Sequence, residues 1–431
     1  MITKKIIEKI EGEAELFFEK KDEKIDFVTI SFEHFRGFSD ILKNKPALDA
    51  LVFTPRICGI CGHSHLYATT RALEDAYKNS SEDIKISNKA YQTREITLIL
   101  EIIQNHLKWI YFVVLEEINK LQNTNFDSIL KGAYGARLIS KIIAIFSGQY
   151  PHSSYMLPGG ITSDFTYVDI TKALGILDEL IIFFQKEVIG VSIEKFLEIG
   201  SCKDFNDIKS DFAFIEKSLI KLQMHKKGFG YDRFLVLGEH SFSTTAKIKK
   251  TIKQNAKIEK VSINEAYSPH KKSFALNALY KDEFIEVGPL ARAMANNEPI
   301  IKNIHRKYKD STYSRVMSRM YEMIKLTKKV KHLIQEISIE EASYIKPKDI
   351  SKITAKGIGV VEAPRGVLIH KVDIIQGKIN SYEIITPTQF NLSSGDKTML
   401  SASQKAMLGV DEKEAGFIFR SFDVCSVCTT H

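Results

Sequence analysis

The chain has 431 residues and a formal net charge of +8, and 44% of its residues are hydrophobic and 26% charged. These values are ordinary for a soluble globular protein with a large core. No stretch approaches the roughly 18 consecutive apolar residues of a transmembrane helix, so the sequence predicts no membrane span.

The positive charge comes mostly from scattered lysines. Lysine-rich stretches at 247–260 and 325–331 fit a solvated helix face better than a surface for nucleic acid or anionic lipid, so we expect no nucleic-acid partner. The N-terminus lacks the apolar core and the cleavage site of a secretory signal. We therefore expect a cytoplasmic protein that becomes membrane-associated or exported only through a partner.

Apolar patterning predicts that most of the chain is helical. Short strands are expected near the N-terminus at 14–18 and 27–30, where β-prone residues gather. Helical spacing of apolar residues begins at 65–78 and continues through 84–122, a long stretch without Pro or Gly. Further helices are expected at 133–147, 164–199, 205–225 and 311–343.

Strands return near the C-terminal end, where turn residues separate β-prone runs at 357–361, 367–372 and 379–385. A final helix is expected at about 398–409. The predicted fold class is mainly α, a bundle of long helices with small peripheral β-sheets. We expect one domain over residues 1–431, with a β-rich N-terminal lobe (1–55), a helical body (56–345) containing an irregular or β-rich insertion (228–290), a β-rich segment (346–395), and a C-terminal helix and metal-binding tail (396–431).

Two Cys-x-x-Cys pairs near opposite ends of the chain use four of its five cysteines: Cys58 with Cys61, and Cys425 with Cys428. Thiolate sulfur is a soft ligand that selects zinc, iron, nickel or copper(I). If the pairs meet in space, the fold closes around a four-thiolate metal centre. Structural zinc is one interpretation, but zinc pairs usually lie about 12–20 residues apart, and here almost the whole chain separates them.

The residues around the cysteines are more specific than the spacing. Residues 56–65 read Arg-Ile-Cys-Gly-Ile-Cys-Gly-His-Ser-His, and the chain ends with Asp-Val-Cys-Ser-Val-Cys-Thr-Thr-His. Four further motifs are Lys-Ile-Glu-Gly at 9–12, Gly-Pro-Leu-Ala-Arg at 288–292, Glu-Ala-Pro-Arg-Gly at 362–366 and Pro-Thr-Gln-Phe-Asn at 387–391. These motifs, and their order along the chain, resemble those of the large, catalytic subunit of nickel–iron hydrogenases.

The resemblance implies a buried nickel–iron centre. Cys58, Cys61, Cys425 and Cys428 would hold the nickel, and Cys61 and Cys428 would also bridge to an iron that carries CO and cyanide ligands. Four thiolates keep nickel rich enough in electrons to change its oxidation state, while the protein cradles the diatomic ligands.

The resemblance also implies roles for other residues. Cys425 would accept the proton released from H2, Glu11 would pass it on, and Arg365 would place a fixed positive charge beside the metals. The residues implied to surround the cofactor are Thr388, Pro387, Pro364, His65 and Asp423.

A magnesium or iron ion lies near the C-terminus in this family, and the resemblance implies His431 and the carbonyl of Ile384 as its ligands here. Ser39 stands where the family has a glutamate ligand, and a serine is a poor ligand for a hard dication. The ion is therefore absent, bound through water, or bound by Asp40 instead.

The activity implied by the resemblance is reversible cleavage of H2 into protons and electrons. Cys202 alone cannot hold an iron–sulfur cluster, so the electrons must leave through an iron–sulfur small subunit. The resemblance leaves open a higher oligomer of such heterodimers. Three other interpretations stay open: an H2 sensor with slow turnover, a non-catalytic relative on the same scaffold, which the four cysteines argue against, and a structural zinc protein.

Overall fold

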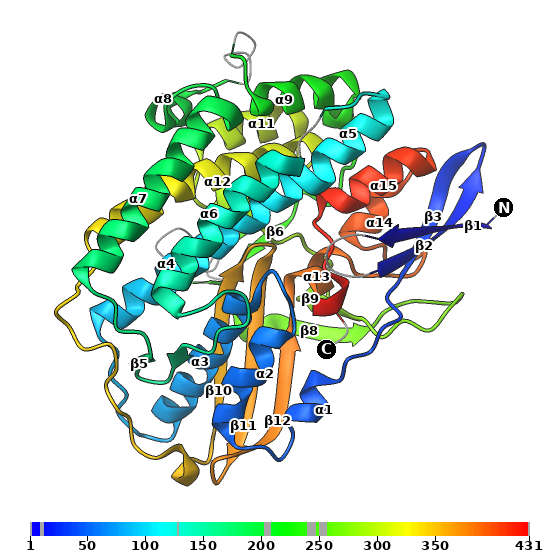
Figure 1. The fold of residues 1–431 in the computed structure, drawn as a ribbon. Helices are drawn as coiled ribbons and strands as arrows, with labels where there is room; N and C mark the ends of the chain where they lie inside the picture. The colour runs from blue at the N-terminus through cyan, green and yellow to red at the C-terminus, as the bar shows by residue number, and fades with distance from the viewer. Residues whose placement is uncertain are drawn as a thin grey trace.

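A bundle of long helices forms the larger part of the molecule (Figure 1). The computed structural model describes residues 2–8, 13–126, 129–201, 208–238, 247–249 and 257–429. Helix α4 (Asn88–Trp109) continues through a π-helical turn into α5 (Leu115–Gln122), and it packs against α6 (Ile129–Ser147) and α12 (Thr312–Gln335). The helices that complete the bundle are α7 (Tyr167–Phe183), α8 (Ile193–Glu198), α9 (Asp211–Lys221), α10 (Pro289–Ala295) and α11 (Pro299–Tyr308).

The stretch Asn88–Gln122 is long and apolar enough to cross a membrane by length and composition, but 89% of its apolar window is buried in the fold. Its side chains meet protein on nearly all sides, which is typical of the core helix of a bundle. We therefore describe it as a core helix.

A three-stranded antiparallel sheet lies at the lower end of the bundle in Figure 1, with helix α3 (Gly62–Asn79) packed on it. Its strands are β10 (Ala355–Ala363), β11 (Gly366–Ile375) and β12 (Lys378–Ile385). Two glycines of β10 let the helix approach closely, because a Cβ added at Gly359 would lie 1.9 Å from the Ala68 carbonyl oxygen, and one at Gly357 would lie 2.0 Å from that of Ala72. The sheet and α3 therefore share a backbone-to-backbone contact that admits no side chain.

A second three-stranded sheet, at the right in Figure 1, is formed by the N-terminal residues and packs against helices near the C-terminus. Its strands are β1 (Ile2–Glu8), β2 (Glu13–Lys21) and β3 (Lys24–Ser31), and apolar side chains of β2 and β3 pack against α14 (Ala402–Met407) and α15 (Glu412–Ser421). The remaining elements are α1 (Phe38–Leu42), α2 (Ala50–Phe53), α13 (Pro387–Asn391) and the two-stranded sheets of β4 (Met156–Leu157) with β5 (Gly160–Ile161), β6 (Phe234–Val236) with β7 (Lys247–Lys249), and β8 (Val261–Glu265) with β9 (Leu276–Tyr280).

The mainly α fold class with small sheets is confirmed, but several helices differ from the sequence expectation. Helices α10 and α11 were not expected, and α12 ends at Gln335 rather than at 343. The helix expected at 398–409 corresponds to α14, which ends just before Gly409 with its φ of +72°. A second helix that was not expected, α15, then begins after its cap residue Asp411. The helix expected at 164–199 breaks at Gly190, which has a φ of +73°. Left-handed glycines mark helix ends that apolar spacing does not reveal.

The contact between α3 and β10 gives a direct test of the fold. We expect Gly359→Ala to destabilise the protein by about 2 kcal/mol or more, since the new methyl group overlaps the Ala68 carbonyl. The matched control is Gly175→Ala, at an exposed position of α7 with open space around it, which should stabilise by up to about 1 kcal/mol. Thermal unfolding of the two variants should shift in opposite directions, and equal shifts would contradict the packing described.

Candidate metal centre

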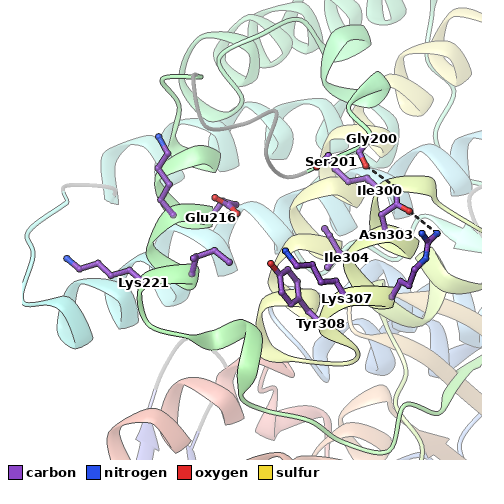
Figure 2. Close-up of a pocket in the computed structure, with 12 residues that line it drawn as sticks. Gly200, Ser201, Glu216, Lys221, Ile300, Asn303, Ile304, Lys307 and Tyr308 are labelled. Atoms are coloured by element: carbon purple, nitrogen blue, oxygen red, sulfur yellow. Dashed lines mark hydrogen bonds between the residues drawn. The ribbon is translucent and has the colours of Figure 1, made fainter.

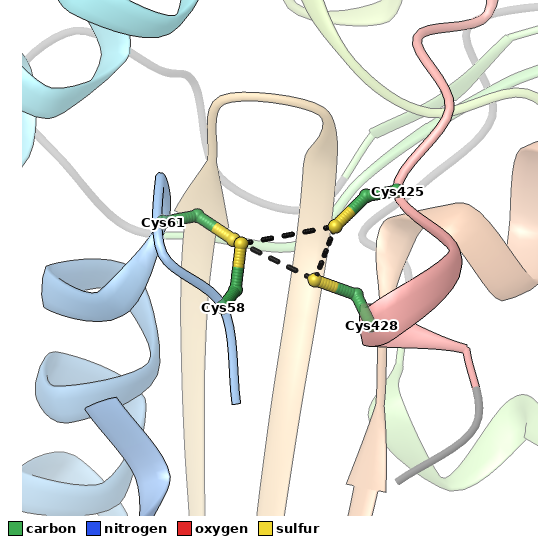
Figure 3. Close-up of side chains that lie close together, drawn as sticks. All are labelled: Cys58, Cys61, Cys425 and Cys428. Carbon is green, nitrogen blue, oxygen red and sulfur yellow. Dashed lines mark hydrogen bonds between the residues drawn. The ribbon is translucent and has the colours of Figure 1, made fainter. Parts of the chain in front are cut away.

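The two cysteine pairs meet in the interior of the protein (Figure 3). Cys58 and Cys61 lie in the loop before α3, and Cys425 and Cys428 lie in the tail that follows α15. The Sγ atoms are 3.7 Å apart for Cys58 and Cys425, 3.6 Å for Cys61 and Cys428, and 2.7 Å for Cys425 and Cys428. All four thiols are buried, and their sulfur atoms lie within 4.8 Å of one another.

The electrostatics of the four thiols suit a bound cation. Burial and the neighbouring thiols raise the pKa of Cys61 and Cys428. Burial also opposes ionisation of Cys425, but hydrogen bonds from its neighbours and the charge of Arg365 outweigh it, so the pKa of Cys425 lies well below the usual range. Sulfur atoms this close ionise together only when a cation lies among them, which is the chemistry of a thiolate metal site.

Helix α4 braces the loop that carries Cys58 and Cys61. The Glu101 carboxyl group accepts hydrogen bonds from the backbone N–H groups of His63 and Ser64 at 2.8 and 2.9 Å. One turn later, the Asn105 side chain donates to the carbonyl of Ile60 at 2.5 Å. Burial raises the pKa of Glu101 to about 8, and nearby Cys58 adds to the shift. The conformation of the first cysteine loop is therefore fixed by two side chains of one helix.

Arg365 lies in the turn between β10 and β11 and points toward the cysteine tail. Its Nη2 is 3.1 Å from Asp423 Oδ1, and its Nη1 donates to Asn105 Oδ1 at 3.3 Å. Burial opposes its charge, but Asp423 and the thiols outweigh this and raise the pKa of Arg365 further. Arg365 therefore stays a fixed cation beside the sulfur atoms.

A second guanidinium lies on the other side of Asp423. Arg319 of α12 places Nη2 3.6 Å from Asp423 Oδ2, and its guanidinium lies 4.3 Å from the centre of the Trp109 ring. Burial lowers the pKa of Arg319 to about 10, so it too carries a charge at neutral pH. The carboxylate two residues before Cys425 thus lies between two cations.

Arg292 of α10 holds the turn that carries Arg365. This fully buried guanidinium pairs with Glu322 at 2.7 Å and with Glu362 at 3.0 Å. It also donates to the backbone carbonyls of Ala363 at 3.0 Å and Pro364 at 3.2 Å. One rigid fork thus makes five hydrogen bonds, and the two to backbone carbonyls fix the chain just before Arg365.

A small space with a cavity volume of about 10 Å³ adjoins one side of the thiol cluster. Cys61 and Cys428 contribute to its wall, together with Ala363, Pro364, Arg365, Leu368, Thr386, Pro387, Thr388 and His65. The Thr388 hydroxyl and the Arg365 Nε are buried there without a hydrogen-bond partner among the described residues. Buried polar atoms are normally satisfied, so these two donors suit small polar ligands seated in an otherwise apolar space.

The structure brings most of the predicted site residues together. His65 lies with its Nε2 3.9 Å from Cys428 Sγ. Ile384 is buried in β12, opposite His370 of β11. Ser39 lies in the short helix α1. Two predicted residues, Glu11 and His431, lie outside the described residues, so their proposed roles stay predictions.

A wider hollow elsewhere on the surface does not share this chemistry. It lies between α9 and α11 (Figure 2), and lysines and an arginine such as Lys221 and Arg306 contribute to its wall. None of the residues that line it is a predicted site residue. The candidate site is therefore the small thiol-lined space, although the hollow between α9 and α11 is larger.

Fold and site together define a large, mainly helical metalloprotein with a four-cysteine centre buried between the two ends of its chain. The chain belongs to the nickel-dependent hydrogenases: the model of that family matches residues 36–127 and 178–431.

Curated relatives match along nearly the full length of the chain. The periplasmic [NiFeSe] hydrogenase large subunit of Desulfomicrobium baculatum is 23% identical and covers 98% of this chain and 93% of its own. Sulfhydrogenase 2 subunit alpha of Pyrococcus furiosus is 26% identical, with coverage of 97% and 96%. A solved [NiFeSe] hydrogenase variant from Desulfovibrio vulgaris Hildenborough superposes with a TM-score of 0.84 at 21% identity over 100% of both chains, which shows the same fold.

Sequence motifs did not identify Glu101, Asn105, Arg319 or His370 as residues near the centre. A signal was present in α4, where Glu101, Gln104, Asn105 and His106 are polar yet occupy buried positions of an apolar helix. Buried polar groups need partners, so such a cluster in a core helix indicates a site rather than packing alone.

The buried pair of His106 and Glu322 gives a prediction of how stability depends on pH. Their side chains are 2.8 Å apart, yet burial lowers the pKa of His106 from 6.5 to about 4, which the contact with Glu322 only partly offsets. In the unfolded chain this histidine takes up a proton at a higher pH than it does in the folded protein, so protonation favours unfolding. The stability that the neutral side chain contributes is therefore complete above pH 6.5 and is lost as the pH falls toward 4. At pH 5 the loss is about 2 kcal/mol.

We expect the drop in thermal midpoint between pH 7.5 and pH 5 to be smaller in His106→Gln than in the unchanged protein, at one fixed heating rate. His332→Gln, at an exposed position of α12, serves as the control and should keep the full drop. An equal drop in all three chains would show that His106 does not set this limb of the pH profile.

Proposed function

We propose that this chain is the catalytic subunit of a hydrogenase that reversibly cleaves H2 into two protons and two electrons. One observation carries the proposal: four buried thiols from the two Cys-x-x-Cys motifs gather within 4.8 Å beside the fixed charge of Arg365. A nickel–iron centre with CO and cyanide on the iron supplies, when bound, the Lewis acidity and the redox chemistry that heterolytic cleavage requires.

The position of the small space beside the thiol cluster supports different roles for the two cysteines of each pair. Cys61 and Cys428 line it, whereas Cys58 and Cys425 are not among its wall residues. We assign Cys61 and Cys428 as the ligands shared by nickel and iron, and Cys58 and Cys425 as ligands of nickel alone. Thr388 and the Arg365 Nε would then donate to the cyanides, while Pro364 and Pro387 exclude water.

Proton transfer in this proposal starts at Cys425. The positive charge of nearby Arg365 favours its thiolate form, so its sulfur has a lone pair available for the proton of H2. Asp423 keeps Arg365 in place, and Glu11 is proposed to carry the proton away. An ion bound by His431 and the Ile384 carbonyl belongs to the same proposal.

Electron transfer in this proposal needs a second protein. Apart from the four clustered cysteines, the sequence has only Cys202, so it cannot hold an iron–sulfur cluster of its own. We propose an iron–sulfur small subunit that docks beside the loop before Cys58. Arg36 donates to the carbonyls of Ile57 and Arg56 on this loop, and the apolar side chains of Phe35 and Val52 nearby are 55% and 46% exposed.

Infrared spectroscopy and metal analysis of the protein, purified with its partner, test the active-site proposal. We expect nickel and iron, and CO and cyanide stretching bands in a window where protein does not absorb. Cys428→Ser should lose these bands and H2 oxidation by at least about 100-fold, since first ligands of a metal are rarely replaceable. Cys202→Ser, which changes the remaining cysteine, is the matched control and should retain both.

Two results would contradict the proposal. Zinc in place of nickel would establish a structural zinc site, and intact infrared bands in Cys428→Ser would refute its assignment as a shared ligand. Turnover distinguishes an enzyme from an H2 sensor, because a sensor would show the same bands with slow H2 oxidation.

The docking proposal makes a separate prediction. Val52→Asp places a charge in the exposed apolar surface next to the first cysteine loop, and we expect it to reduce co-purification of the small subunit by tenfold or more. The control is Val168→Asp on α7, which is 75% exposed and lies on the helical bundle. If both variants bind the partner equally well, the docking face lies elsewhere.

A further inference from the structure

A row of four hydrogen-bonding side chains leads from Cys428 into the contact between α3 and its sheet. His65 Nε2 lies 3.9 Å from Cys428 Sγ, and His65 Nδ1 lies 3.0 Å from His370 Nε2. On its other side, His370 Nδ1 lies 2.8 Å from the Tyr382 hydroxyl and 3.0 Å from the Thr69 hydroxyl. Each of these side chains is at most 5% exposed, so water does not take the place of any partner in the row.

The row depends on how closely α3 approaches the sheet. His65 and Thr69 are four residues apart and so lie on one face of α3, while His370 and Tyr382 reach them from β11 and β12. The glycine contact between β10 and α3 brings these faces together. The direct contact of the two imidazoles therefore depends on this close packing of α3 on the sheet.

The chemistry at the two ends gives the row a direction. A metal-bound thiolate has no proton and only accepts hydrogen bonds, so the His65 nitrogen that faces Cys428 must carry the hydrogen. His65 Nδ1 then accepts, which requires a hydrogen on His370 Nε2. His370 Nδ1 accepts in turn, and either of the two hydroxyl groups beside it, which also contact each other at 2.9 Å, can donate to it.

We propose that His370 is a positioning residue that locks His65 in the tautomer whose Nε2–H points at the Cys428 sulfur, with Tyr382 and Thr69 locking His370 in the same way. The inference rests on the proposed function in one respect, since it takes Cys428 as a metal-bound thiolate. A hydrogen bond to such a sulfur draws electron density from it, so the row tunes how much charge the shared cysteine donates to the metals.

Replacing His370 removes the donor to His65 Nδ1 and so favours the alternative tautomer of the His65 ring. The alternative tautomer presents a nitrogen lone pair to the thiolate, which repels it, and the ring then turns away or loses this contact. The sulfur becomes richer in electrons, and back-donation from the iron to CO increases. The CO stretching band therefore moves to lower wavenumber.

The test uses infrared spectra of the complete metal-loaded complex. We expect His370→Leu to shift the CO band to lower wavenumber, with nickel and iron content unchanged. His370→Gln is the conservative variant, because its amide N–H can donate to His65 Nδ1 from nearly the same place, and it should restore the band toward its original position. His332→Leu, at an exposed position, should leave the spectrum unchanged.

A second variant covers the case in which His370→Leu fails to assemble its centre. Tyr382→Phe combined with Thr69→Val keeps both imidazoles but removes the two donors to His370, and it should shift the band in the same direction. Unshifted bands in this double variant, or equal shifts in His370→Leu and His370→Gln, would overturn the inference. The absence of CO and cyanide bands from the unchanged protein would instead refute the proposed function itself.

Discussion

Four sulfur atoms held within 4.8 Å of one another in a dry interior are the constraint on which the rest of this structure depends. Thiolates repel each other strongly when water is excluded, so the protein must hold the four together by other contacts until a cation joins them. The loop of Cys58 and Cys61 is held by α4, and the tail of Cys425 and Cys428 is held by the packing of α15 against the N-terminal sheet. Segments near both ends of the chain therefore contribute ligands to one site and are held in place by the surrounding fold.

The buried charges around the sulfur atoms follow from the same constraint. Arg292 and Arg365 lie fully within the protein, and each is matched by carboxylates. Buried ion pairs repay their desolvation only when the geometry is good, and apolar side chains of similar size often stabilise a fold as well or better. Their position here, behind the turn of Arg365 and beside Asp423, fits a role in fixing the charge next to the centre rather than in stability.

How much of this was visible in the sequence differs between fold and site. The long helices follow from the helical spacing of apolar residues, and the strands of the β10–β12 sheet follow from β-prone runs separated by turn residues. The break at Gly190 did not, because a glycine in a left-handed conformation has no signature in apolar spacing. The cysteines, Arg365 and Thr388 were found through their motifs. Arg319 and His370 reach the site from a distant helix and strand, and nothing in their local sequence indicates that contact.

The assembled site is not symmetric around its four sulfur atoms. Cys425 faces the cation of Arg365, Cys428 faces the imidazole of His65, and Cys58 lies near the carboxyl group of Glu101. A full positive charge and a neutral donor draw electron density from their sulfur atoms to different degrees, whereas the Glu101 carboxyl group accepts hydrogen bonds from His63 and Ser64 and exerts no such pull. Thiols with the same covalent structure thus become chemically distinct through the side chains of α3, α4 and the β10–β11 turn. Such a difference is what a centre needs if one cysteine is to take a proton while others only hold metal.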